Sequence, residues 1–428
     1  NEESSVKVSA NNSVLGTFTS NPVNLSSYTS TFAIEKNKTF AYSASQEVVT
    51  VQVEYLQPNS NSEAWLNHIT INARARLQMT GDQLIFRDSR SAGVGNITEF
   101  RISNITANTQ VWEITDPENP KKIPHQRTGS NGSFRLKTDQ LREFIAFKSD
   151  GNFPVPGIKG TGIGKVPNQN LHGTPPPEMI IIHAEEFEEQ AARLAEHRRT
   201  NDNLSVGLVT QQMIFNEFSS GTPDVGAIRN YLKMFYDAYP EEQMVQYLLL
   251  FGDGSFDNRD TGSYNPNLIL TYQSTNSLSP TGSYVSDDFF GLLDTGEGLY
   301  DGMLDIGIGR LPASTIEEAE LLVDKLIEYD QPETFGDWRN YICFIGDDED
   351  GNIHMRQANS LATTIEEKYP DYNINKIFLD AYPQESTPTG DRYPDVTRAI
   401  NDQMNRGALI INYTGHGGVN GLAHEKIL

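Results

Sequence analysis

Hydrophobic and polar residues alternate in the first third of the chain. Between positions 69 and 79 the odd residues are apolar and the even ones polar, and residues 49–55 repeat this period of two. Such alternation is typical of β-strands with one buried face. Turn-forming pairs such as Asn131-Gly132 separate these runs. Residues 1–150 are therefore predicted to form an N-terminal all-β domain, either a sandwich or a barrel-like fold.

The amino-acid composition changes near residue 151. Twelve of the 27 residues from 151 to 177 are Gly or Pro, which favours an interdomain linker. The charge changes at the same place. Residues 1–150 contain 15 basic and 15 acidic residues, whereas residues 151–428 contain 18 and 42.

After the linker, short apolar runs alternate with amphipathic segments. The apolar runs are predicted strands, at 179–182, 205–209, 247–251, 304–308, 341–345, 375–378 and 408–412. One helix is predicted over 185–199, and a second follows a capping box formed by Ser314 and Glu317. Repeated strand–helix–strand units indicate parallel pairing, so residues 178–428 are predicted to form an α/β domain with a mainly parallel sheet.

Charge and length limit the possible partners. The net charge of −24 repels phosphate backbones, so nucleic acid is not an expected partner. The longest apolar runs are far shorter than the roughly 20 residues of a membrane helix, so no transmembrane segment is predicted. The chain begins with Asn1 and has no signal-like segment, as expected of a mature chain.

Polar side chains follow three of the predicted strands, namely Asp253, Asp347 and His416. Because ligands of parallel sheets bind at the carboxyl ends of the strands, we expect these three residues to converge on one edge, where Asp253 is a candidate substrate-binding residue. His416 lies between Gly415 and Gly417, and glycine there leaves the backbone NH groups accessible to a substrate carbonyl. Such a His can move protons near neutral pH, although a loop His that makes a single hydrogen bond is the alternative.

The residues around His416 resemble a known motif. Asn-Tyr-Thr-Gly-His-Gly at 412–417 is similar to the catalytic-histidine motif of the gingipain family of cysteine peptidases. Four further segments agree in order. They are Tyr-Leu-Leu-Leu-Phe-Gly-Asp-Gly at 247–254, Ser-Asp-Asp-Phe-Phe-Gly at 286–291, Asp-Ile-Gly-Ile-Gly-Arg-Leu-Pro at 305–312 and Ile-Cys-Phe-Ile-Gly-Asp at 342–347. Segments 164–172 and 216–221 add a resemblance to the surface peptidases of the type IX secretion system.

This resemblance implies a caspase-like α/β domain in which a Cys attacks a peptide carbonyl. His416 would move the proton, the NH of Gly417 would help to hold the oxyanion, and Asp347 would orient the imidazole. The implied activity is removal of C-terminal sorting signals from exported proteins. The implied location is the bacterial cell surface, in association with outer-membrane proteins of the secretion system.

The sequence departs from the family pattern in two places. The family's nucleophile lies beyond the His, and no Cys follows His416 here, so the chain is expected to be C-terminally incomplete and inactive by itself. Cys343 lies within an apolar strand, where a buried thiol is expected to be structural. His354 occupies the position at which arginine-specific members carry an Asp, so it is either a substrate-binding residue or a residue of a helix start.

The acidic loops raise the question of a metal. No cofactor is required for the implied reaction, but Asp253, Asp257, Asp287 and Asp288 are candidate ligands of a structural calcium ion, with Asp260 nearby. Solvated acidic loops are the alternative. A non-catalytic surface module that binds a partner on the same scaffold is the rival to the peptidase hypothesis.

Overall fold

The computed structural model divides the chain into two compact units, Asn1–Gln169 and Asn170–Leu428. It describes residues 2–24, 26–27, 29–46, 48–153, 168–255, 257–258, 267–280, 282–298, 302–388, 390–418 and 421–428. Most of the expected linker, residues 154–167, lies outside the described residues, so its nature stays a prediction.

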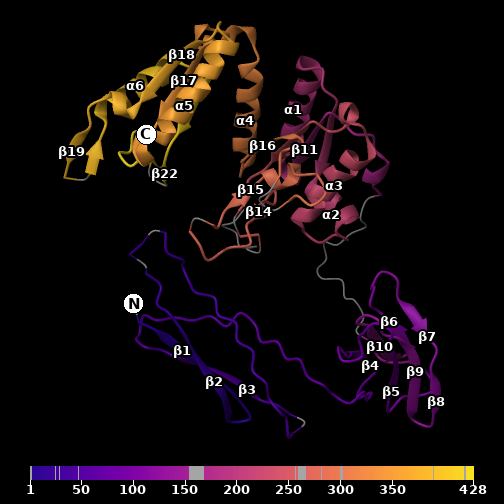
Figure 1. Ribbon diagram of the computed structural model, residues 1–428. Helices are drawn as coiled ribbons and strands as arrows, with labels where there is room; N and C mark the ends of the chain where they lie inside the picture. Colours follow the sequence, from indigo (N-terminus) through magenta and orange to yellow (C-terminus); the bar gives the residue numbers. More distant parts are fainter. Residues whose placement is uncertain are drawn as a thin grey trace. The chain divides into compact units, whose positions relative to one another are not determined.

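The first strands of unit 1 form an antiparallel sheet in the order β2-β1-β3 (Figure 1). The strands are β1 Ser4–Ala10, β2 Ser13–Ser20 and β3 Val51–Leu56. The predicted alternating strand at 49–55 corresponds to β3. The predicted strand at 69–79 is wrong for most of its length, because only Gln78 forms a bridge, to Ser103.

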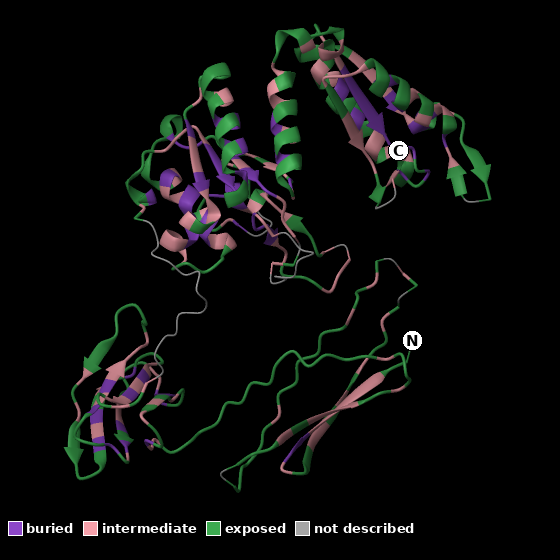
Figure 2. Cartoon of the chain, turned by 180° about the vertical axis from the view of Figure 1, so that it is seen from behind, coloured by how far each residue is buried: buried purple, intermediate pink, exposed green. Residues whose placement is uncertain are grey.

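Residues 63–76 are exposed and form no strand (Figure 2). Trp65 is 77% exposed and Ile71 is 66% exposed. An alternating segment becomes a half-buried strand only where a neighbouring strand accepts its backbone hydrogen bonds. No strand among the described residues pairs with this segment, so its apolar side chains stay exposed.

The rest of unit 1 is a sandwich of two antiparallel sheets. One sheet has the order β4-β10-β6-β7 and the other the order β5-β9-β8. The strands are β4 Gln83–Arg87, β5 Ile97–Ile102, β6 Thr109–Glu113, β7 Lys121–Ile123, β8 Gln126–Thr128, β9 Asn131–Lys137 and β10 Glu143–Lys148. Phe144 of the first sheet packs on Phe100 and Phe134 of the second, with ring centroids 5.0 and 5.3 Å apart. These aromatic contacts form the core of the predicted β domain.

Unit 2 begins with a parallel sheet in the order β12-β11-β13-β16. The strands are β11 Met179–His183, β12 Val206–Thr210, β13 Tyr247–Phe251 and β16 Gly307–Leu311. Helices cover both faces, because Ile180 and Ile182 pack with α2 and α3, whereas Ile181 packs with α1 and α4. These helices are α1 Glu188–Asn201, α2 Gln211–Phe218, α3 Val225–Ala238 and α4 Ile316–Tyr329.

The remaining parallel strands form a separate sheet in the order β18-β17-β21. They are β17 Tyr341–Gly346, β18 Asn373–Phe378 and β21 Ile410–Thr414, and they are flanked by α5 Glu349–Lys368 and α6 Pro394–Arg406. Cys343 and Ile345 point into the core beside α6, and Ile342 and Phe344 pack beside α5. Both faces of the central strand β17 are thus covered, which explains its continuous apolar run.

Short elements complete the described chain. The hairpin strands are β14 Tyr272–Gln273, β15 Val285–Ser286, β19 Glu385–Thr387, β20 Gly390–Arg392, β22 Gly417–Gly418 and β23 Gly421–Leu422. The 3₁₀ helices are η1 Leu171–Gly173, η2 Glu185–Phe187, η3 Glu241–Gln243, η4 Asp288–Gly291, η5 Pro332–Thr334, η6 Asp337–Asn340 and η7 Leu379–Ala381. No helix of the described residues combines the length and the apolar character that crossing a membrane requires.

Two local predictions need correction. The predicted strands at 304–308 and 408–412 are shifted by two or three residues, to β16 and β21. The N-cap of α4 is Thr315, which accepts a hydrogen bond from the NH of Glu318, and not Ser314. Ser314 instead donates its hydroxyl to Asp253, while its NH binds the Glu318 carboxylate. The N-cap therefore lies one residue later than expected, and the carboxylate of Glu318 reaches back to the NH of the residue before the cap.

Candidate active site

Asp347 and His416 lie just beyond the carboxyl ends of two neighbouring strands. Gly346 of β17 is paired with Thr414 of β21. The NH of Asp347 donates to the carbonyl of Thr414 over 3.1 Å, which extends the ladder by one residue. The strand-end rule therefore brings these two side chains together, as expected from the sequence.

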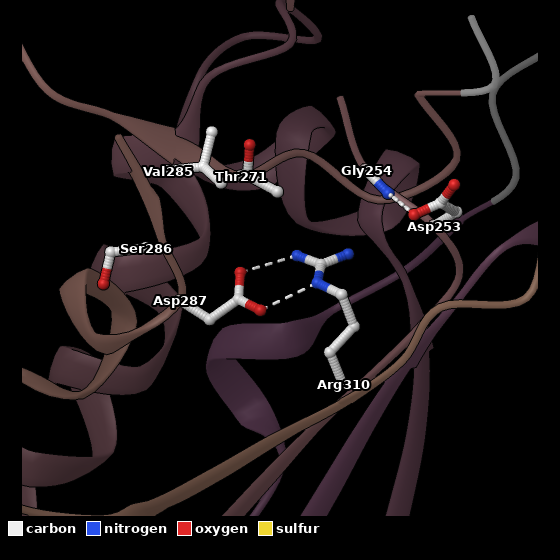
Figure 3. A pocket seen from close by; sticks show the side chains of 7 residues that line it. All are labelled: Asp253, Gly254, Thr271, Val285, Ser286, Asp287 and Arg310. Carbon is white, nitrogen blue, oxygen red and sulfur yellow. Dashed lines mark hydrogen bonds and ion pairs between the residues drawn. The ribbon is translucent and has the colours of Figure 1, made fainter. Parts of the chain in front are cut away.

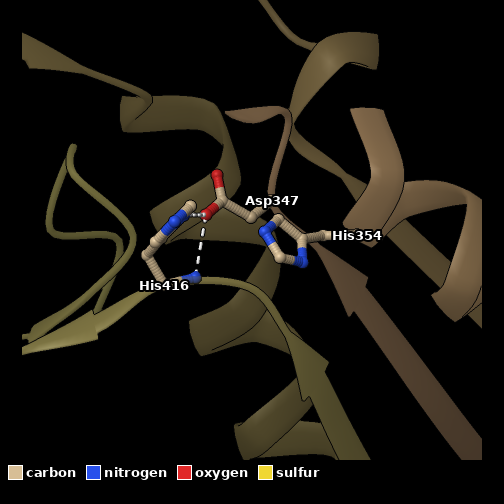
Figure 4. Close-up of side chains that lie close together, drawn as sticks. All are labelled: Asp347, His354 and His416. Atoms are coloured by element: carbon tan, nitrogen blue, oxygen red, sulfur yellow. Dashed lines mark hydrogen bonds and ion pairs between the residues drawn. The ribbon is translucent and has the colours of Figure 1, made fainter. Parts of the chain in front are cut away.

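The imidazole of His416 is held by the Asp347 carboxylate (Figure 4). Its Nδ1 lies 2.9 Å from Oδ2 of Asp347, and the backbone NH of His416 donates to the same oxygen over 2.9 Å. The side chain of Asp347 is fully buried, whereas that of His416 is 49% exposed. Nε2 lies 3.3 Å from the exposed carboxylate of Asp350. One ring nitrogen is thus fixed and the other faces the surface.

The pKa values of this pair shift in opposite directions. The hydrogen bond with Asp347 raises the pKa of His416, against the desolvation that would lower it, and the charges of Asp350 and Glu349 raise it further. Burial alone would raise the pKa of Asp347, but the hydrogen bonds from the backbone and ring of His416 lower it overall. Asp347 therefore stays ionised and stabilises the protonated imidazole.

Gly415 permits this close approach. A Cβ at Gly415 would overlap Cβ of Asp347 and the hydroxyl of Tyr413. Gly417 and Gly418 are different, because a Cβ at Gly417 would meet only Leu422, at 3.8 Å, and one at Gly418 would meet nothing. The first glycine of the motif is thus required by packing around the His–Asp pair.

The backbone at His416 is fixed from the other side. Its carbonyl accepts hydrogen bonds from the Tyr413 hydroxyl over 2.6 Å and from the NH of Ala423 over 2.8 Å. Gly417 follows directly and pairs with Leu422 in the β22–β23 hairpin. The structure therefore gives the turn a fixed backbone, while the role of the Gly417 NH as an oxyanion donor stays a prediction.

His354 lies beside the pair (Figure 4). Its ring centroid is 5.0 Å from that of His416, with the rings nearly perpendicular. It reaches this place because α5 is interrupted near its start by left-handed residues, with φ of 53° at Asp350 and 62° at Asn352. Ligand atoms of Asp347, His354 and His416 lie within 4.8 Å of one another. A metal ion there would compete with the proton for the imidazole of His416.

Asp253 does not join this group. It follows β13, which belongs to the other parallel sheet, so the expectation that all three strand-end residues share one edge is wrong. The apolar pattern marks strands but does not say which sheet each one joins. Asp253 lines a separate cavity of about 250 Å³ (Figure 3). The cavity is lined by Asp253, Gly254, Thr271, Val285, Ser286, Asp287 and Arg310.

The charged groups of this cavity are satisfied by protein. Arg310 binds both carboxylate oxygens of Asp287, each over 2.8 Å, and also donates to the carbonyl of Gly252 (Figure 3). Asp253 accepts hydrogen bonds from the NH of Gly254 and the hydroxyl of Ser314. The ion pair between Arg310 and Asp287 thus ties β16 to the loop before η4.

The expected calcium ligands are not gathered into one site. None of the groups of three closely spaced His, Cys or carboxylate ligands among the described residues includes Asp253, Asp257, Asp287 or Asp288. Asp260 lies outside the described residues. Asp287 already has a guanidinium partner, which disfavours a cation at that carboxylate. Calcium at these loops stays a prediction.

Several residues at this site escaped the sequence analysis. Tyr413 holds the His416 carbonyl, Asp350 faces Nε2, and Glu425 is buried close to Asp347. The sequence gives no clear signal for the burial of Glu425, because it stands between His424 and Lys426. Cys343 is buried as expected, and burial raises its thiol pKa to about 11.

Comparison with known proteins agrees with this site. The family model described as "Peptidase family C25", the gingipain family of cysteine peptidases, matches residues 172–428. Among solved structures, the chain is similar to dimeric latent PorU from Porphyromonas gingivalis, with 28% sequence identity and a TM-score of 0.62. The match covers 77% of this chain and 32% of the PorU chain, so the chain spans about a third of that protein's length. No curated protein matches the chain.

Proposed function

The chain belongs to the gingipain family, peptidase family C25, and from this premise we propose that unit 2 carries the general base of a cysteine peptidase. The observation that supports the proposal is the 2.9 Å contact between Nδ1 of His416 and Oδ2 of Asp347, with Nε2 on the exposed side. A buried carboxylate that holds one ring nitrogen fixes the tautomer in which the other nitrogen is basic.

The proposed reaction follows from this geometry. Nε2 of His416 takes the proton of a Cys thiol, and the resulting thiolate attacks the peptide carbonyl. The NH of Gly417 donates to the developing oxyanion. The imidazolium, stabilised by Asp347, then protonates the leaving amine, and in the second half of the reaction it accepts a proton from the water that hydrolyses the thioester.

The burial of Cys343 argues against this residue as the nucleophile. This residue is the only Cys of the chain, it is fully buried, and its pKa is raised to about 11. A thiol in that environment is neither ionised nor accessible near neutral pH. We therefore propose that these 428 residues are inactive alone and that the reaction requires a Cys outside them.

The finer assignment rests on the likeness to PorU and on the sequence resemblance. We propose that the domain is caspase-like and that its substrates are exported proteins with C-terminal sorting signals. The protein would then act at the bacterial cell surface, together with outer-membrane proteins of a type IX secretion system. We propose that His354, whose ring centroid lies 5.0 Å from that of His416, contacts the substrate residue next to the cleaved bond.

Active-site labelling tests the proposal. In a protein that contains these residues together with the Cys nucleophile, a peptide-like inhibitor that alkylates ionised thiols should label the wild type. It should label His416→Ala at least about 100-fold more slowly, because the thiol loses its base. His424→Ala is the control, since His424 is exposed and lies in the same segment. Equal labelling of wild type and His416→Ala would refute the assignment.

A further inference from the structure

A second group of carboxylates lies next to the His416–Asp347 pair. Asp347 and Asp348 follow β17, and Glu425 lies in the segment after β23. One carboxylate oxygen from each residue lies within 4.8 Å of the other two. We propose that Asp347, Asp348 and Glu425 bind a divalent cation and that calcium is the ion that fits them best.

Two of these oxygens have no partner in the part of the chain that the structure describes. They are Oε2 of Glu425 and Oδ1 of Asp348, and both are buried. Glu425 as a whole is only 4% exposed. Buried carboxylate oxygens are costly without a hydrogen bond or a cation, so such a pair points to an occupant between them.

The remaining oxygens are held in place. Oδ2 of Asp348 accepts a hydrogen bond from the Tyr393 hydroxyl over 2.6 Å, and Oε1 of Glu425 accepts one from Nε2 of Gln384 over 3.0 Å. One oxygen of each of these two carboxylates is therefore held by a hydrogen bond, while the other has no such partner among the described residues. A preformed arrangement of this kind lowers the cost of ordering ligands around an ion.

The charge of the group is not balanced by basic side chains. Among the described residues, no Lys or Arg forms an ion pair with Asp347, Asp348 or Glu425, and the only cationic partner is the ring of His416, at Asp347. The three carboxylates lie close together, and Asp347 and Glu425 are buried, so their charges repel one another. Either a metal ion or a proton must relieve this repulsion.

The donor set favours calcium over other metals. All three ligands are carboxylate oxygens, and hard cations are the ions that prefer such ligands. Calcium accepts oxygens at about 2.3–2.6 Å, so two of its ligands can be almost 5 Å apart, as the spacing here allows. Magnesium requires shorter distances and a stricter geometry.

A bound cation would connect the two segments that position His416. It would link the end of β17 to the segment containing Ala423, whose NH holds the His416 carbonyl. Asp347 would be shared between the cation and the imidazole. This inference concerns metal binding and goes beyond the proposed peptidase function, because it needs no nucleophile.

Calcium titration of the 428-residue chain tests the inference. After treatment with EGTA, the chain should bind calcium in isothermal titration calorimetry, and calcium should raise its melting temperature. Glu425→Gln should weaken this binding at least about 10-fold. Glu385→Gln is the matched control, because Glu385 is an exposed carboxylate of the same unit and is not one of the three proposed ligands. Asp348→Asn provides a second variant that removes a different ligand.

The comparison without calcium distinguishes a metal site from a protonated carboxyl. At pH 7.5 in EGTA, Glu425→Gln should melt at the same temperature as the wild type or higher, because it removes a buried repulsion. With calcium, only the wild type and Glu385→Gln should be stabilised through this site. Absence of calcium binding by the wild type, or equal binding by wild type and Glu425→Gln, would overturn the inference.

Discussion

Asp347 accepts two hydrogen bonds from His416 at one oxygen, one from the backbone NH and one from ring Nδ1, each 2.9 Å long. The acceptor is fully buried and the ring is half exposed. The same residue thus fixes both the turn and the imidazole, and Nε2 keeps access to the surface. This relationship is the basis of the peptidase proposal.

The stability of the fold should depend on pH through this pair. The folded-state pKa of His416 is raised, so its protonation adds to the free energy of unfolding. This stabilisation is complete below the unfolded pKa of about 6.5 and is lost as the pH rises through the folded pKa. The pKa of Asp347 is lowered, so its contribution is present above about 3.9 and is lost as the pH falls through the folded pKa. The pair therefore stabilises the folded state most between about pH 3.9 and pH 6.5.

Urea unfolding of wild type and His416→Gln at several pH values measures this effect. The difference in the free energy of unfolding should fall between pH 6 and pH 9, by less than about 1 kcal/mol because the ring is half exposed. His424→Gln, at an exposed position, should show no such trend. A difference that stays constant or grows over this range would contradict the pairing.

Substitution of Gly415 should disrupt the site by steric overlap. The new Cβ of Gly415→Ala would collide with Asp347 and the Tyr413 hydroxyl, so we expect a loss of about 1–3 kcal/mol in the free energy of unfolding. Gly418→Ala is the control, because its Cβ meets no atom within 4 Å. Equal unfolding curves for the two variants would show that the turn is not packed as described.

The thiol of Cys343 should be unreactive in the folded chain. It is fully buried, and its pKa is raised to about 11. Alkylation by iodoacetamide at pH 8 should be about 100-fold slower or more in the native chain than in urea. Because the chain has no other Cys, mass spectrometry reads this rate directly. Native labelling as fast as in urea would reopen Cys343 as a nucleophile.

Arg310 should stabilise the fold through the hydrogen bonds of its guanidinium group with the Asp287 carboxylate. Arg310→Lys loses the two-point contact with Asp287 and the bond to the Gly252 carbonyl, which should cost about 2–3 kcal/mol in urea unfolding. Arg193→Lys is the control, because its pair with Asp324 is exposed, and it should cost about 0.5 kcal/mol or less. Similar costs for both would contradict the buried role of Arg310.

The sequence predicted those features that depend on neighbours along the chain. The runs at 179–182, 247–251 and 341–345 become β11, β13 and β17, because strands buried on both faces require continuous apolar residues. The pairing of Asp347 with His416 followed from strand ends that meet in a parallel sheet. Both inferences need only local pattern and a general rule of topology.

Features that depend on distant partners were not predictable. The alternation at 69–79 has no strand among the described residues to pair with over residues 69–76, which stay exposed, and only its end is held by the bridge from Gln78 to Ser103. Asp253 follows a strand of a different sheet from Asp347. Glu425 is buried only because the last segment folds back on the His416 carbonyl. In each case the outcome depends on which backbone accepts a hydrogen bond, and side-chain pattern does not encode that choice.

NMR of the 428-residue chain with ¹⁵N-labelled histidine can measure where the His416 ring carries its proton. This measurement tests directly whether Asp347 orients His416 as a general base. We predict that the neutral ring carries its proton on Nδ1 and that the pKa of His416 lies above its ordinary value. Asp347→Asn should lower that pKa. A neutral ring with its proton on Nε2, or a pKa that Asp347→Asn leaves unchanged, would contradict the assignment of His416 as an oriented general base.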